Sequence, residues 1–278
     1  MNQGTATSIQ PNSATRNSFW FLLIVTVIGG MLAEVAFGAL KSSGLRDRLP
    51  ALVALIIPPA VSGLILPYLL IRLVYRSRLR EFGIRWVDPE RRMAPWLVWG
   101  SIVTVLTWLA FWGLICAGLV MATKTAPDQV PMTLAEFHAK NPLHMLLSGS
   151  ANPRIVATVL HMTVLVGFIE ELFGRGFLQS ALDRRYTRVF GRGRFTVRAS
   201  TLLAAILFAF WHTQWLGGDA KAILGSMAIS LTIVLVPSLL LSVVYERTRS
   251  MLAVILLHDV IDGGKLLAWY AWSWILPG

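Results

Sequence analysis

The feature that most constrains this chain is a series of apolar runs that recur from one end of it to the other. A helix needs about 20 mainly apolar residues to cross the hydrocarbon core of a bilayer. Because 55% of the residues are hydrophobic and only 14% are charged, we expect an all-α fold, a polytopic transmembrane helix bundle of about seven spans. The seven runs lie at residues 19–40, 51–75, 95–121, 155–180, 199–217, 222–245 and 251–272.

Glycine and proline residues leave the span count open. The last run could divide at Gly263 and Gly264, which would give eight spans. The second run contains Pro58, Pro59 and Pro67, which in a membrane helix indicate a kink or a break supported by neighbouring helices. We therefore predict seven spans, with eight as the alternative.

The polar segments divide the chain into three parts. Residues 1–18 form a polar tail, residues 19–150 hold the first transmembrane helices, and residues 151–272 hold the remaining ones. No repeat and no stretch with the composition of a soluble domain is evident, which predicts one membrane domain. The single cysteine, Cys116, excludes a disulfide framework and is expected to be a packing residue.

The distribution of Lys and Arg beside the spans predicts the orientation of the chain. With a cytoplasmic N-terminus, the inner segments hold more than twice as many of these cations as the outer ones, as the positive-inside rule requires. Loops 76–94 and 183–198 are then cytoplasmic, and we expect a multi-pass protein of a bacterial cytoplasmic (inner) membrane. The net charge of +11 needs only membrane lipids as partners, so nucleic acid is not expected.

Three of the apolar runs carry ionisable residues at similar depths. Such residues are costly in lipid and usually face a protein interior, where they serve a pathway or a reaction. Counted from the cytoplasmic ends of their helices, Glu170, His212 and Asp262 lie roughly 20 Å deep and His258 roughly 14 Å deep. Three separate helices therefore bring polar groups to one layer near the membrane middle.

Helical spacing predicts which of these groups can pair. Glu171 and Arg175 are four residues apart, so they share a face and can form an ion pair. Glu170 is rotated by one position and stays available for water or metal. His258 and Asp262 are also four apart and can hold one water molecule or one metal ion.

Carboxylates and imidazoles are the groups that activate water and stabilise a tetrahedral oxyanion. The motifs that carry them resemble EExxxR, FxxxH and HxxxN/D of the CAAX prenyl protease and bacteriocin-processing family, also called the Abi family of intramembrane proteases. They lie here at Glu170 to Arg175, Phe208 to His212 and His258 to Asp262. The resemblance covers about residues 155–262, and we recognise no family motif in residues 1–150.

The resemblance implies an intramembrane endopeptidase whose site opens towards the cytosol. Glu170 would activate the attacking water and His212 would help to hold it, while His258 and Asp262 would stabilise the oxyanion. The motif pair Glu171 and Arg175 would hold the site together.

Two chemistries remain open, because similar proteins are described both as metalloproteases and as a glutamate-dependent class. A divalent metal such as zinc would have Glu170, His212, His258 and Asp262 as candidate ligands. Position 262 is Asp where many members have Asn, and an ionised Asp cannot donate a hydrogen bond to an oxyanion. Asp262 is then either protonated through burial, or it orients His258 or binds a cation. We hypothesise the role of orienter or ligand.

Other polar residues have structural interpretations. We expect His161 to be a packing residue, and His138 and His144 have no assigned role. Glu34 and Lys265 are expected to be ion partners of neighbouring helices, or else to line the substrate path.

Two classes of function remain. The first is a protease acting on a membrane-associated peptide or protein, of which a prenylated CAAX tail is one case and a peptide precursor another. The second is a non-catalytic bacteriocin-immunity or transporter-like membrane protein on the same fold, since intramembrane carboxylates and histidines also suit proton relays. A protease must lose function in Glu170→Gln, whereas a binding protein could retain it.

Overall fold

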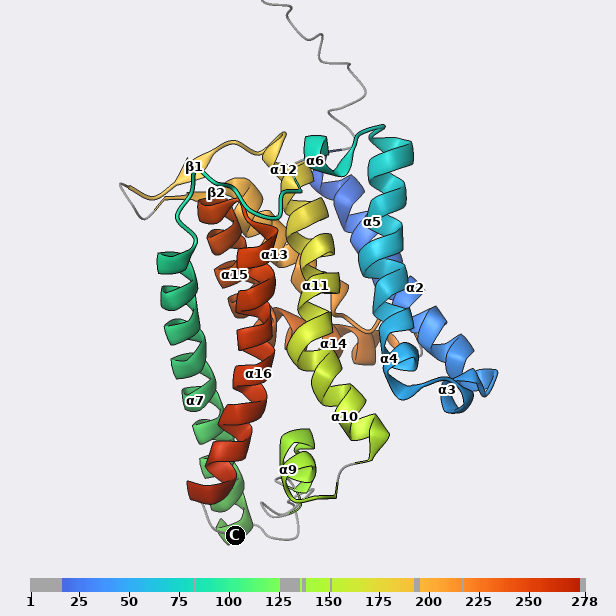
Figure 1. The fold of residues 1–278 in the computed structure, drawn as a ribbon, viewed down its shortest axis with the longest axis vertical. Helices are drawn as coiled ribbons and strands as arrows, with labels where there is room; N and C mark the ends of the chain where they lie inside the picture. The colour runs from blue at the N-terminus through green and yellow to red at the C-terminus, as the bar shows by residue number, and fades with distance from the viewer. Residues whose placement is uncertain are drawn as a thin grey trace, which may run out of the picture.

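The computed structural model describes residues 17–82, 84–125, 136, 139–150, 152–192, 196–216 and 218–275. Residues 1–16 of the polar tail, and His138, therefore lie outside the described residues. Figure 1 shows that almost all of the described chain is helical. Strands β1 (Val189–Phe190) and β2 (Val197–Arg198) form a small antiparallel pair between helices α12 and α13. The all-α helical bundle expected from the apolar runs is confirmed.

The helices of the first half of the chain follow the predicted runs closely. Pro58 and Pro59 lie inside a helix that continues through π-helical turns to Val74, and the Ser62 hydroxyl donates to the carbonyl of Pro59 at 3.3 Å. The elements are α2 (Phe19–Ser42), α3 (Leu45–Arg48), α4 (Ala51–Ala60), η1 (Val61–Ile65), α5 (Leu66–Leu69), η2 (Leu70–Val74), α6 (Leu79–Phe82) and α7 (Ala94–Thr125).

The second half holds the helices on which the candidate site residues lie. The α10 to α12 segments join end to end through π-helical turns into one rod. The elements are α9 (Pro142–Leu147), α10 (Pro153–Leu160), η4 (His161–Leu165), α11 (Val166–Glu171), η5 (Leu172–Gln179), α12 (Ser180–Asp183), α13 (Ala199–Trp211), α14 (Ala220–Ile233), α15 (Leu235–Thr248) and α16 (Met251–Ile275).

Four helices among the described residues are long and apolar enough to cross a membrane, and a fifth is counted if α14 and α15 form one span. These two helices meet at a bend of 48°, so the predicted continuous run 222–245 is broken. The physical reason is Pro237. Its ring would clash with the backbone carbonyl of Ile233, four residues earlier, if the helix were continuous. The four are Phe19–Ser42, Ala51–Val74, Ala94–Ala122 and Pro153–Asp183.

Two further predicted runs differ from the helices that they form. Helix α13 has 13 residues and ends at Trp211, so the run 199–217 is helical only in its first part. Helix α16 runs unbroken for 25 residues through Gly263 and Gly264, so the chain does not divide there into an eighth span. The total of seven spans stays a prediction.

An apolar surface covers the outside of the bundle. Along α7, large side chains are exposed, among them Val98, Leu106 and Leu114, the last at 75% of its full exposure. Contiguous apolar surface of this kind marks contact with a partner or a membrane. Because these residues repeat along a helix that is itself long enough to cross a bilayer, they are suited to contact lipid.

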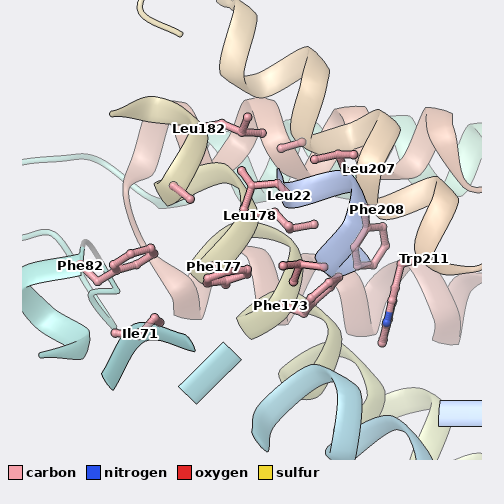
Figure 2. Close-up of a cluster of buried hydrophobic side chains, with 13 residues drawn as sticks. Leu22, Ile71, Phe82, Phe173, Phe177, Leu178, Leu182, Leu207, Phe208 and Trp211 are labelled. Carbon is pink, nitrogen blue, oxygen red and sulfur yellow. The ribbon is translucent and has the colours of Figure 1, made fainter. Parts of the chain in front are cut away.

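Inside the bundle, two apolar clusters surround the polar layer. The first joins the α11 to α12 rod to α13 and α2, as Figure 2 shows with Phe173 between Phe177 and Trp211. The second joins α15 to α16 and includes Leu241, which also lines the cavity described below. Aromatic rings of the first cluster pack at centroid distances of 5.0 Å for Phe173 and Trp211 and 5.7 Å for Phe208 and Trp211. These clusters fix the helices whose polar side chains meet between them.

Candidate active site

Three helices supply the polar layer. Glu170 and Glu171 end α11, and Arg175 follows on η5. The rod that carries them begins at Asn152, whose side chain accepts hydrogen bonds from the first free backbone N–H groups of α10, a common N-cap. His212 is the C-terminal cap residue of α13, and its backbone N–H donates a hydrogen bond to the carbonyl oxygen of Ala209.

Glu170 lies at the centre of the site. Its Oε2 is 3.3 Å from Nε2 of His212 and 3.6 Å from Nε2 of His258. Asp262 completes the group, because its Oδ2 is 3.5 Å from Nε2 of His258. The structure thus brings together the four residues that were predicted to be catalytic, from α11, α13 and α16.

The second nitrogen of each imidazole has a fixed partner. Nδ1 of His212 lies 2.9 Å from the carbonyl oxygen of Phe208, and Nδ1 of His258 lies 2.6 Å from Oε1 of Glu171. A carbonyl and a carboxylate oxygen can only accept hydrogen bonds, so both Nδ1 atoms carry a proton. The Nε2 atoms are therefore the nitrogens that face Glu170, and they are the ones available for proton transfer.

The charges around His258 favour a cationic ring. Its Nε2 faces oxygens of both Glu170 and Asp262, and a bare nitrogen lone pair would be repelled by two carboxylates. A proton at Nε2 removes this repulsion and turns His258 into a donor on both nitrogens. Such a group can donate a hydrogen bond to a developing oxyanion.

Glu171 and Arg175 form the predicted ion pair and do more than balance each other. Nη1 of Arg175 donates to Oε1 of Glu171 at 2.9 Å, and both side chains are essentially fully buried. The same Oε1 accepts from Nδ1 of His258. Glu171 therefore orients His258, a role that the sequence pattern suggests only for Asp262.

Arg175 is held from its other side by residues that the sequence did not single out. Nη2 donates to the carbonyl oxygen of Ser238 at 2.6 Å and to its hydroxyl at 2.9 Å. The guanidinium carbon also lies 4.5 Å from the centre of the Phe208 ring, a distance typical of cation–π contact. Ser238 carries no sequence signal, since a serine in an apolar helix normally satisfies its own backbone.

Glycines let the helices approach closely here. A Cβ atom added at Gly174 would lie 2.8 Å from Cδ2 of Phe208, and one added at Gly167 would lie 2.5 Å from Oδ1 of Asp259. The first distance is shorter than real carbon contacts allow. Gly174, within the EExxxR string, thus allows the close packing of η5 against α13 that positions both Arg175 and Phe208.

A cavity of about 280 Å³ opens beside the four residues and is lined by all of them. Its remaining walls are mostly apolar, with Trp108, Pro237 and Leu241 among them. His161, expected to be a packing residue, lines this cavity, and Lys265 lies on it too. Because side chains of Glu170 and His212 remain 13% and 27% exposed, water in the cavity can reach them.

A divalent metal was one of the options for this site. Among the residues that the structure describes, no group of three or more His, Cys, Asp or Glu side chains is arranged to hold a metal ion. The described residues therefore show no preformed metal centre at Glu170, His212, His258 and Asp262, and a zinc ion at this site stays a prediction. The polar atoms of these four side chains contact one another and neighbouring protein groups.

Comparison with known proteins identifies the region that carries the site. No curated protein and no solved structure matches this chain. Residues 152–264, roughly two fifths of the chain, match the family described as "Type II CAAX prenyl endopeptidase Rce1-like". All seven residues that the three motifs specify lie within this match. The apolar helices and this match make the chain a membrane protein, and residues 152–264 are similar to the family of type II CAAX prenyl endopeptidases.

Proposed function

We propose that the protein is an intramembrane endopeptidase that hydrolyses a peptide bond of a membrane-associated peptide or protein with water activated by Glu170. The observation that carries this proposal is the position of the Glu170 carboxylate between two imidazole Nε2 atoms, at 3.3 and 3.6 Å, on a cavity of about 280 Å³ within an apolar bundle. The family match supports a peptide bond as the bond that is cleaved.

The first step is attack by water. Glu170 accepts a proton from a water molecule in the cavity that contacts both its carboxylate and His212, and the water oxygen attacks the carbonyl carbon of the substrate. The carbonyl oxygen becomes an oxyanion that accepts a hydrogen bond from Nε2–H of His258. Glu171 and Asp262 hold this ring and stabilise its positive charge.

The second step releases the products. The tetrahedral intermediate collapses, the C–N bond breaks, and the amine takes the proton that Glu170 received, directly or through His212. The new carboxylate and amine then leave the cavity. No step is assigned to a metal ion, because the described residues do not form a metal site.

The setting of the reaction follows the charge distribution. We place the N-terminus and the basic loops at the cytoplasmic face of an inner membrane, with membrane lipids around the apolar helices. Substrate then reaches the cavity from the cytosolic leaflet, and nucleic acid is no partner.

The experiment is cleavage of internally quenched peptides by purified protein in detergent. Wild type is compared with Glu170→Gln, which keeps the size of the side chain but removes the base, and with Glu90→Gln, a matched change at an exposed glutamate. We expect a loss of about 10²- to 10⁴-fold in kcat for Glu170→Gln and none for Glu90→Gln.

A chelator arm tests the chemistry separately. Cleavage that persists in chelator is expected from the glutamate mechanism, and cleavage that is lost and restored by zinc would contradict it. Full activity of Glu170→Gln would contradict the protease mechanism itself and favour a non-catalytic binding protein.

A further inference from the structure

The loop that follows His212 is held by a carboxylate from a distant helix. Glu34 lies on α2, and its two oxygens accept hydrogen bonds from consecutive backbone N–H groups. Oε1 accepts from Trp215 at 2.6 Å and Oε2 accepts from Leu216 at 2.8 Å. These contacts join parts of the chain about 180 residues apart.

Further contacts fix the same loop. The preceding N–H, of Gln214, donates to the Ser226 hydroxyl on α14 at 2.8 Å. Three consecutive N–H groups are therefore bound by side chains of two other helices. The indole of Trp215 lies against Gly30 of α2, where an added Cβ would be 2.8 Å from its Cδ1. Gly30 and Glu34 are about one helical turn apart and share a face of α2. The indole of Trp215 packs on Gly30, and the Glu34 carboxylate binds the backbone of the loop.

The chemistry of Glu34 points to backbone binding. From its place in an apolar run, Glu34 is expected to be an ion partner of a neighbouring helix or to line the substrate path. None of the ion pairs among the described residues involves Glu34, and it does not line the cavity that holds Glu170. A carboxylate that accepts two N–H groups makes charge-assisted hydrogen bonds, which are stronger than neutral ones. Because Glu34 makes these bonds to a loop without regular structure, we infer that the protein needs this loop in a fixed position.

The loop is coupled to His212 through the last turn of α13. Nε1 of Trp215 donates to the carbonyl oxygen of Phe210 at 3.2 Å, two residues before His212. The indole of Trp211, in the same turn, lies against Gly29 of α2 at 3.3 Å from a Cβ added there. The helix end that presents His212 is thus fixed from both sides by α2 and by the loop that Glu34 holds.

We propose that Glu34 is a positioning residue of the active site, which fixes the loop at Trp215 and Leu216 and through it the distance between His212 and Glu170. This inference rests on the proposed function of the site, and it extends that function to the N-terminal helices, which lie outside the family match. Loss of the Glu34 side chain should lower the rate by displacing His212, because a displacement of about 1 Å can lower a rate by about 100-fold.

The test uses the full chain in detergent and two substitutions. Glu34→Ala removes both acceptors, and Glu34→Gln keeps the size of the side chain but leaves one acceptor oxygen. Lys41→Ala, at an exposed position of the same helix, is the control for a change in α2 away from the loop. Folding of each variant is verified by its elution profile and helix content.

The first readout needs no substrate. Hydrogen exchange at the amides of Trp215 and Leu216 should rise at least about tenfold in Glu34→Ala, because each loses a charged acceptor. Nitrogen NMR of histidine-labelled protein should show changed ring signals for His212. The signals of His258 should change less than those of His212, since Glu171 holds that ring from within the neighbouring helices. Histidine signals are assigned with single substitutions of His212 and His258.

The second readout is kinetic. We expect Glu34→Ala to lower kcat by about 100-fold with an unchanged KM, to shift the pH dependence of kcat/KM, and Glu34→Gln to lie between it and wild type. A loss of activity that only follows the fraction of folded protein, with an unchanged pH dependence, would mean a structural role and would overturn the inference. Unchanged His212 signals, or equal changes at His258, would overturn it too. Because exchange and NMR are independent of cleavage, failure of the proposed protease function is distinguished from failure of this inference.

Discussion

Replacing Arg175 with Met should strongly destabilise the protein, because it leaves the Glu171 carboxylate buried without its cation. Both side chains are buried to 1% exposure or less, and the pair is joined at 2.9 Å. Breaking such a buried pair by removing one partner typically costs about 3–5 kcal/mol. The two hydrogen bonds from Arg175 to Ser238 are lost as well. Since these terms share one side chain and do not add, we expect a total loss of about 3–5 kcal/mol.

The double variant Glu171→Leu, Arg175→Met separates stability from activity. Replacing both members of a buried ion pair with apolar residues is often neutral or stabilising, so most of the lost stability should return. Activity should not return, because Nδ1 of His258 loses the acceptor that lies 2.6 Å away. A variant that is stable but inactive is therefore the expected result.

Thiol labelling provides the assay. Cys116 is the only cysteine of the chain and is completely buried, so its modification in increasing concentrations of SDS reports unfolding. The midpoint should move to lower SDS in Arg175→Met and return towards wild type in the double variant. A destabilisation below about 1 kcal/mol in the single variant would place this pair among weak ion pairs and refute the reasoning. A double variant with wild-type activity would refute the orienting role of Glu171.

Two further changes test other parts of the site. Asp262→Asn should lower kcat/KM by about tenfold or more, which corresponds to at least about 1.4 kcal/mol of transition-state stabilisation, because an amide cannot balance the charge of His258. Full activity of this variant in the peptide assay would contradict the hypothesis that Asp262 orients His258 or binds a cation. Gly174→Ala should cost about 1–3 kcal/mol by the Cys116 assay, because its Cβ would lie 2.8 Å from Phe208. Gly38→Ala, where an added Cβ meets nothing within 4 Å, should be neutral or slightly stabilising, and equal losses at both positions would argue against the steric explanation.

Element boundaries show where a sequence is informative about this fold. Runs of apolar residues predicted the helices of the bundle because a backbone in lipid has few alternatives to a helix. The same runs did not reveal the early end of α13 at Trp211 or the bend before Pro237. Hydropathy does not distinguish an apolar residue in a helix from one in a loop that other helices hold.

Within one helix, the candidate site could be predicted from spacing. Residues four apart share a face, and the structure accordingly pairs Glu171 with Arg175 at 2.9 Å and His258 with Asp262 at 3.5 Å. Similar depths from the membrane surface also predicted that Glu170 would meet residues of two other helices. These arguments need only the geometry of a single helix and the bilayer.

The contacts between helices were decided by the tertiary structure. Spacing assigned Glu171 to Arg175 alone, yet Glu171 also binds His258. Glu34 binds a loop that lies about 180 residues later in the sequence. Which faces meet depends on how each helix rotates and slides as its side chains pack, and this depends on many contacts at once. No local sequence pattern reveals the combined effect of these contacts. The sequence by itself therefore determined the helices and their polar faces, while only the packing of the helices determined which polar groups are partners.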